Sequence, residues 1–182
     1  MKKLLIPAAL LLVAACNSSQ PTPVETAAAH IDSVKKINSP FPVTYSSQFE
    51  IADPKYAETI LTLWKDFDAG DLNTHKDLFA DSVSLYLTDG ASLLGRRDSI
   101  ISWTQKYRGA YKSVVDRVDA VTALRSTDKN ENWALVWGME TSTDMKGKVD
   151  STNLMETWRF NKDGKVDLLY QHRMDFPKLK KK

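Results

Sequence analysis

Apolar side chains recur at every third or fourth position after Asp53 and Pro54, which is the spacing of one buried helix face. They are Ala57, Ile60, Leu61, Trp64 and Phe67. The Asp-Pro pair before them is typical of a helix start, and Gly70 after them is typical of a helix end. The segment 73–79 suits a short second helix, and a third helix is expected after Gly95.

Later in the chain, apolar and polar positions alternate, which indicates strands. A short strand pair is predicted around the Asp89-Gly90 turn. Four longer alternating segments follow, at residues 112–125, 132–144, 148–161 and 165–175. Helices followed by such a meander predict an α+β fold, in which three N-terminal helices pack in a curved antiparallel sheet. Because long strands twist and curl, we expect a cone with an open mouth.

Turn lengths predict which side chains of the last three strands are neighbours. A two-residue turn at Lys146-Gly147 pairs Trp137 with Glu156. A three-residue loop at 162–164 then pairs Glu156 with Tyr170. These registers place the apolar side chains of the three strands on one shared face, which a buried sheet face requires.

Two ionisable residues, Glu156 and His172, lie on this otherwise apolar face in the predicted register. Glu156 is then a direct neighbour of Tyr170 and a diagonal neighbour of His172. One interpretation is a ligand pocket with Glu156, Tyr170 and His172 as its polar, candidate catalytic end. Its walls would be Trp64, Tyr86, Trp103, Tyr107, Trp137 and Trp158. The alternative is a satisfied polar pair near the sheet rim, with the aromatic side chains filling the core.

Proline and glycine divide the chain into parts. None of the seven prolines lies between residues 55 and 176, and all seven glycines lie inside that interval. Such a stretch is typical of a folded unit, so we assign the domain to residues 53–176. Residues 16–52 read as a tether whose last part is expected to dock on the domain, and residues 177–182 form a basic tail.

The first residues resemble a bacterial lipoprotein signal. Lys2 and Lys3 precede the apolar stretch 4–15, which is too short to span a bilayer, and Cys16 follows it directly. The resemblance implies removal of residues 1–15, acylation of Cys16 and attachment to a lipid bilayer. Asn17 follows the cysteine, which by analogy favours the outer membrane, so we expect a lipid-anchored protein of the bacterial cell envelope that faces the periplasm.

Charge and metal-ligand spacing exclude two classes of function. The formal charge is +2, but six of the 25 basic residues lie in the signal and the tail, which leaves 19 against 23 acidic residues and a charge of −4. Nucleic acid is therefore not an expected partner. The three histidines, His30, His75 and His172, are far apart and Cys16 is the only cysteine, so no metal site and no cofactor are expected.

The segment from Tyr56 to Arg173 resembles the nuclear transport factor 2-like (NTF2-like) superfamily, in its SnoaL-like branch. The segments that carry the resemblance are 67–72, 78–83, 95–100 and 158–166. It implies a cone-shaped α+β barrel with a pocket, often dimeric through its sheet. The superfamily includes polyketide cyclases, ketosteroid isomerase, dehydratases and non-catalytic binding domains. The isomerase's tyrosine falls at about Leu63 or Trp64 and its aspartate at about Tyr86 or Leu87, so that chemistry is not supported.

Three functions therefore stay open. The first is a membrane-tethered domain that binds a small, partly apolar molecule. The second is a lyase or isomerase that uses Glu156 or His172 as general base, with Tyr170 as donor. The third is a non-catalytic interaction module or homodimer that uses the outer sheet face. On that face we expect Met155, Thr157, Arg159, Leu169, Gln171 and Arg173.

Overall fold

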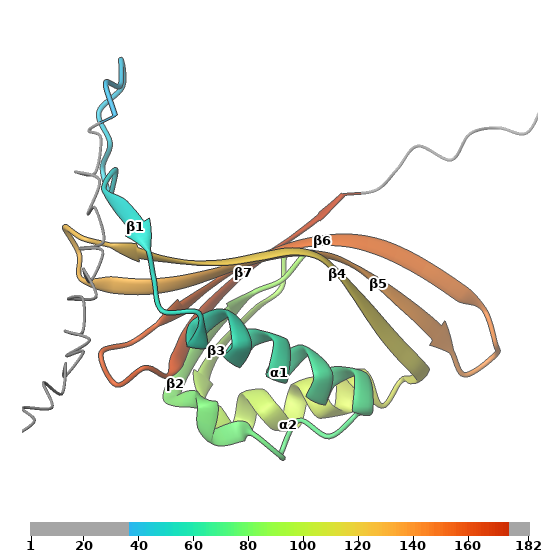
Figure 1. Cartoon of the computed structure of the whole chain (residues 1–182). Coiled ribbons are helices and arrows are strands. Elements are labelled where there is room, and N and C mark those ends of the chain that lie inside the picture. Colours follow the sequence, from blue (N-terminus) through green and yellow to red (C-terminus); the bar gives the residue numbers. More distant parts are fainter. Residues whose placement is uncertain (1–36, 175–182) are drawn as a thin grey trace, which may run out of the picture. The chain divides into compact units, whose positions relative to one another are not determined.

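A computed structural model describes residues 37–174, and these residues form one curved sheet with helices on its concave side (Figure 1). The first half of the chain forms β1 (Phe49–Ile51), α1 (Lys55–Ala69), a 3-10 turn η1 (Lys76–Leu78), β2 (Phe79–Tyr86), β3 (Ser92–Arg96) and α2 (Arg97–Arg108). The second half forms the long strands β4 (Tyr111–Ser126), β5 (Glu131–Asp144), β6 (Val149–Phe160) and β7 (Val166–Met174).

The strands lie in the order β1-β4-β5-β6-β7-β2-β3. All neighbours are antiparallel except β2 and β7, which are parallel. The expectation of a purely antiparallel sheet is therefore wrong. The β2–β3 hairpin comes before β4 in the sequence, but β2 pairs with β7, the last strand of the chain. Because the connection between β2 and β7 is long, the two strands can run parallel.

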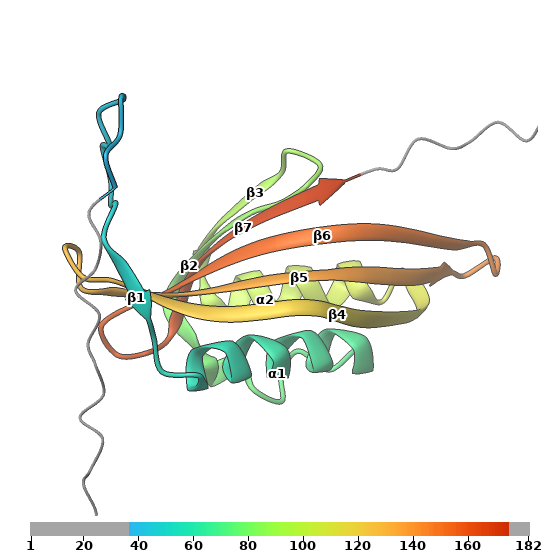
Figure 2. The same ribbon diagram turned by 45° about the horizontal axis from the view of Figure 1, so that its top comes forward.

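Within residues 37–174, two α-helices rather than three pack under the sheet, and both run along the strands (Figure 2). The N–H of Lys55 donates to the Asp53 carboxylate at 3.0 Å, and Gly70 ends α1 in the left-handed conformation with φ 74°. The short helix expected at 73–79 is reduced to the 3-10 turn η1 at Lys76–Leu78. Asp71 accepts hydrogen bonds from the Asn73 N–H and the Thr74 hydroxyl, which favours turns over a helix.

The core lies between the two helices and the concave face of the sheet. Ile60 of α1, Val83 of β2, Val136 of β5 and Phe160 of β6 are among its fully buried side chains. The even-numbered residues of β5 and β6 point into this core, and the odd-numbered ones point to the outer face.

The register of β5 and β6 differs by one residue from the expected one. The N–H of Asp144 donates to the carbonyl of Lys148 at 2.9 Å, so the loop is the three residues 145–147, with Gly147 at φ 84°. Glu156 therefore pairs with Val136, and Trp137 pairs with Met155 on the outer face. The extra loop residue moves every side chain of β5 to the opposite face.

A bulge changes the register of β6 and β7. The loop at 162–164 has the expected three residues and Phe160 pairs with Val166, but Asp167 is then an extra residue on β7. Arg159 of β6 donates to both oxygens of the Asp167 carboxylate, at 2.9 and 3.2 Å, which favours this bulge. Beyond it Glu156 pairs with Gln171, so Gln171 points into the concave side and Tyr170 points out.

Gly138 of β5 allows a close approach of α1 to the sheet. A Cβ atom at this position would lie 2.5 Å from the Arg117 carbonyl oxygen and 2.9 Å from a ring carbon of Trp64. A bulge of the partner strand β4 lies opposite this glycine, between Val118 and Ala120. The glycine thus makes room for the Trp64 indole against the strand.

The chain before α1 forms the edge of the sheet opposite β3. β1 pairs with β4, so the sheet includes residues assigned above to the arm. Tyr45 packs edge-on against Trp133, with ring centroids 6.2 Å apart, and its hydroxyl donates to Glu131. This contact buries Trp133 on the outer face of the sheet.

The predicted signal peptide, Cys16 and the basic tail lie outside the described residues. Within residues 37–174, no helix has the length and apolar character needed to cross a membrane.

Candidate binding pocket

A cavity of about 280 Å³ lies between the concave face of the sheet and the two helices. Helix α1 contributes Leu63, Trp64 and Phe67 to its lining, and α2 contributes Trp103 and Tyr107. The strands β4, β5, β6 and β7 contribute most of its polar side chains. Its size is near the lower end of about 300–1,000 Å³ that is common for small-molecule sites.

The carboxylate of Glu156 is held in the wall of this cavity by three N–H donors. The indoles of Trp64 and Trp158 both donate to Oε2, at 2.6 and 2.9 Å, and the side-chain amide of Gln171 donates to Oε1 at 2.7 Å. Glu156 is only 4% exposed. Because an indole N–H cannot accept a hydrogen bond, Oε2 must act as an acceptor, and the orientation of the carboxylate is fixed.

Burial and hydrogen bonding act in opposite directions on this group. Desolvation raises the pKa of Glu156, and the hydrogen bonds from Gln171, Trp64 and Trp158 lower it, with a net raised pKa. The three donors stabilise the charged form and oppose the effect of burial, but burial remains the larger effect on the pKa.

Two further carboxyl groups, Asp116 of β4 and Glu140 of β5, line the same cavity. Burial, followed by the charges of Asp68, Glu140 and Glu156, raises the pKa of Asp116 to about 8. Burial and the charges of Glu156 and Asp68 also raise the pKa of Glu140. Asp116 Oδ1 is buried and has no hydrogen-bond partner among the described residues. The empty pocket therefore favours a protonated Asp116 at neutral pH.

The end of α1 fixes the position of Asp116. The buried guanidinium of Arg108 donates to the carbonyl oxygens of Phe67 at 2.7 Å, Asp68 at 2.8 Å and Tyr111 at 3.1 Å. The Asp68 carboxylate in turn accepts the backbone N–H of Asp116 at 2.9 Å. Helix α2 thus ties α1 to the strand that carries Asp116.

Aromatic side chains form another part of the lining. Trp103 and Tyr107 stack with ring centroids 5.6 Å apart and an interplanar angle of 5°, and Tyr111 meets Tyr107 at 5.5 Å and 63°. Trp103 is 39% exposed and Tyr107 is 45% exposed. These rings therefore line a part of the pocket that is open to solvent.

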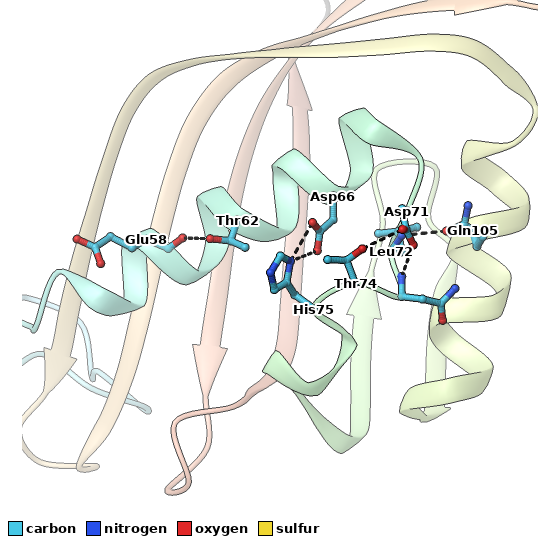
Figure 3. A network of polar contacts seen from close by, with 9 residues as sticks. Glu58, Thr62, Asp66, Asp71, Leu72, Thr74, His75 and Gln105 are labelled. Atoms are coloured by element: carbon cyan, nitrogen blue, oxygen red, sulfur yellow. Dashed lines mark hydrogen bonds and ion pairs between the residues drawn. The ribbon is translucent and has the colours of Figure 1, made fainter.

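A polar network joins the end of α1 to the following loop and to α2 (Figure 3). The side chain of Gln105 accepts the N–H of Leu72 at 3.0 Å and so positions a residue of the pocket lining. His75 Nδ1 lies 2.9 Å from Asp66 Oδ2. This histidine–aspartate pair does not line the pocket, and it connects the loop to α1.

The structure brings five of the nine expected site residues together and separates the other four from them. Glu156, Trp64, Trp103, Tyr107 and Trp158 all line the cavity. Tyr86, Trp137, Tyr170 and His172 do not. The longer loop reverses the facing of Trp137, and the bulge at Asp167 reverses that of Tyr170 and His172.

The outer face also differs from the expected one. Met155 and Tyr170 are exposed there, and Tyr86 stacks on Tyr170 with centroids 5.2 Å apart. The expectation that Leu169, Gln171 and Arg173 lie on this face is wrong, because all three line the cavity on the concave side.

The polar pocket residues that sequence reasoning missed include Asp116, Glu140 and Gln171. Glu140 and Gln171 have the correct facing once the three-residue loop and the bulge are known. For Asp116, a carboxylate alternating with valines in a long strand is the available signal. No group of three or more potential metal ligands comes together within residues 37–174.

Comparison with protein-family models and with curated proteins finds no match. Solved structures do match. An NTF2-like protein from Exiguobacterium sp. 255-15 superposes with a TM-score of 0.53 at 18% identity, over 65% of this chain and 99% of that one. A proposed dehydratase of the NTF2-like family from Streptomyces avermitilis gives 0.54 at 14% identity, over 65% and 94%. SalBIII, an epoxide hydrolase/cyclase-like enzyme in pyran ring formation in salinomycin, gives 0.53 at 14%, over 66% and 91%. The chain therefore has the NTF2-like fold.

Substitutions of Glu156 should separate the need for acceptors from the need for charge. In Glu156→Gln the amide oxygen can accept hydrogen bonds from both indole N–H groups, and the Gln171 amide can rotate so that its oxygen accepts from the new amide. We therefore expect a free energy of unfolding within ~1 kcal/mol of that of the native protein. Glu156→Leu leaves the indole donors of Trp64 and Trp158 without an acceptor and should cost about 2–4 kcal/mol. Urea unfolding measures both values, and the indole N–H resonances should shift only slightly in the glutamine variant. Equal losses in the two variants would contradict this account.

Asp116 should make stability fall as pH rises. Its pKa is raised from 3.8 to about 8 on folding, so its stabilising contribution is complete below pH 4 and is lost as pH approaches 8. Asparagine resembles the protonated acid and does not titrate. From pH 5 to pH 8.5, the free energy of unfolding of Asp116→Asn relative to that of the native protein should therefore rise by ~2 kcal/mol. This is less than the whole pKa shift would give, because solvent in the open pocket screens the charge. Urea unfolding at both pH values tests this.

Asp119→Asn is the matched control on the same strand. Asp119 is exposed and its hydrogen bond from Arg117 lowers its pKa, so it stays charged over the whole range. A pH-independent difference for Asp116→Asn, or the same trend in both variants, would refute the raised pKa.

Proposed function

We propose that this domain binds a small, partly apolar molecule in the cavity between its sheet and helices. The observation that carries the proposal is an open cavity of about 280 Å³ whose wall holds the rigidly oriented carboxylate of Glu156. Apolar side chains such as Leu63, Phe67 and Leu154 form other parts of the same lining. A largely apolar concavity with a few fixed polar groups is typical of small-molecule sites.

A lyase or isomerase reaction is the second candidate. The specific observation in its favour is Asp116, whose pKa of about 8 suits proton transfer near neutral pH, with the carboxyl group of Glu140, whose pKa is also raised, in the same lining. Two of the similar folds are a cyclase-like enzyme and a proposed dehydratase, which is consistent with such chemistry. Against it, the Glu156, Tyr170 and His172 set expected from the sequence is not assembled. Binding without turnover is therefore our first choice.

A dimer through the outer sheet face is compatible with ligand binding, because the cavity opens on the other side of the sheet. Met155 and Tyr170 are exposed on that outer face. The cavity itself argues against a purely structural module, whose core would be expected to be filled.

We further propose that the chain is anchored to a bacterial membrane by lipid on Cys16 and that the domain faces the periplasm. The proposal rests on the order of charged residues, apolar stretch and cysteine in residues 1–16. Two or more acyl chains on one residue are sufficient for stable attachment, whereas one is marginal.

Blocking the cavity should abolish ligand retention. Thr152 of β6 lines the cavity, so Thr152→Trp should fill it, whereas Thr157→Trp on the outer face of the same strand is the matched control. Native mass spectrometry of the full mature protein should show a bound species below about 500 Da, at least tenfold less abundant in Thr152→Trp and unchanged in Thr157→Trp. The absence of any adduct from the native protein, or equal adducts in both variants, would contradict the proposal.

Cys16→Ser should leave the protein soluble or unprocessed, because serine has no thiol for acylation. Fractionation of cells and intact-mass measurement test this, with the native protein expected in the membrane fraction at the mass of a lipidated chain beginning at Cys16. A serine variant that is processed and still membrane-bound would refute the anchor.

A further inference from the structure

The charges that line the cavity have one predominant sign. Five carboxyl groups face it, those of Asp89, Asp116, Glu140, Asp150 and Glu156, against one guanidinium, that of Arg173. Burial first, and then the charges of Asp68, Glu140 and Glu156, raise the pKa of Asp116 in this lining. A positive charge placed among them would relieve this repulsion, whereas a negative one would increase it.

One carboxyl oxygen of the lining has no partner. Asp116 Oδ1 is buried without a hydrogen bond among the described residues, whereas both oxygens of Glu156 are occupied by N–H donors. A buried acceptor without a donor costs free energy, and a ligand that supplies an N–H donor would remove that cost. The unpartnered atom therefore indicates what chemical group the cavity lacks.

Aromatic rings stand in the same lining. The stacked pair Trp103 and Tyr107, with Tyr111 against it, contributes π faces beside the carboxyl groups. Aromatic faces attract organic cations and also pack against apolar groups. A monatomic cation fits less well, because no three ligand groups of the described residues come together.

We propose that the ligand of this pocket is a small organic cation, an amine with an apolar or aromatic body, whose ammonium group lies by Asp116 and Glu140. This inference rests on the binding function proposed above and specifies its ligand class. The aromatic rings contact the body and the carboxyl groups neutralise the charge.

Binding of such a cation must be linked to proton release. Asp116 faces Asp68 and Lys65 of α1, Glu140 of β5 and Glu156 of β6, and its pKa of about 8 means that the empty site holds a proton at pH 7. An ammonium group stabilises the carboxylate form and lowers that pKa, so the site releases a proton as the amine enters. A neutral ligand would release none.

Three probes with a shared phenyl body and different end groups test the ligand class: phenethylamine, 2-phenylethanol and phenylacetate. Isothermal titration calorimetry with the full mature protein at pH 7 should give at least tenfold tighter binding of the amine than of the alcohol, and the weakest binding of the carboxylate. The heat of amine binding should differ between phosphate and MOPS buffers by the amount expected for release of up to one proton. In Asp116→Asn the affinity for the amine should fall at least fivefold with little change for the alcohol, and Asp119→Asn should leave both unchanged.

Failure of this inference differs from failure of the binding function. Equal affinities for amine and alcohol, tightest binding of phenylacetate, or no binding of the amine would overturn the cationic ligand class. The native mass spectrum judges the binding function separately. A neutral or acidic adduct that Thr152→Trp loses would leave the binding function standing without the amine, and no adduct together with no probe binding would refute both.

Discussion

The buried carboxylate of Glu156 is the constraint on which the interior depends. A carboxylate with 4% exposure is strongly disfavoured unless donors surround it, and its three donors come from three elements: Trp64 from α1, Trp158 from β6 and Gln171 from β7. The distance between helix and sheet, the facing of β6 and the register of β7 must therefore all be correct at once. One polar group thus couples three elements that the apolar core alone would position less strictly.

The position of the Trp64 indole depends on the lack of a side chain at Gly138. Any Cβ at Gly138 would meet both the Trp64 ring and the Arg117 carbonyl oxygen, so only glycine lets the ring lie against β5. The bulge of β4 opposite Gly138 shows that the two strands adjust at the same point. The Trp64 indole that lies against Gly138 lines the pocket together with Trp103 and Tyr107.

The sequence predicts the two longer helices, the long strands, the curved sheet and the NTF2-like fold. It also predicts the inward facing of Glu156 and Trp158, because alternation within one strand is local. It fails on the neighbouring strands, where facing depends on one residue in a loop or a bulge. The predicted two-residue turn at Lys146-Gly147 leaves Met145 out of the loop, so the predicted facing of Trp137 is wrong. The bulge at Asp167 likewise reverses the predicted facing of Tyr170 and His172. That bulge is accompanied by a contact between strands, from Arg159 to Asp167, which alternation along one strand does not reveal. The parallel pairing of β2 with β7 is likewise a property of the whole sheet.

Burial makes the Glu156 carboxylate require hydrogen-bond donors, and burial also raises the pKa values of Asp116 and Glu140. Their pKa values are raised by burial first and by neighbouring carboxylates second. For Asp116, whose pKa is about 8, the protonated form is therefore favoured at neutral pH, and the cost of an unpaired buried charge is avoided. Such groups acquire charge when an opposite charge arrives. A permanently charged pair of carboxylates would instead repel each other and destabilise the empty fold. Protonation in the empty state thus reconciles a stable domain with a cavity that is strongly acidic in composition, and it makes occupancy of that cavity sensitive to both the charge of the ligand and the pH.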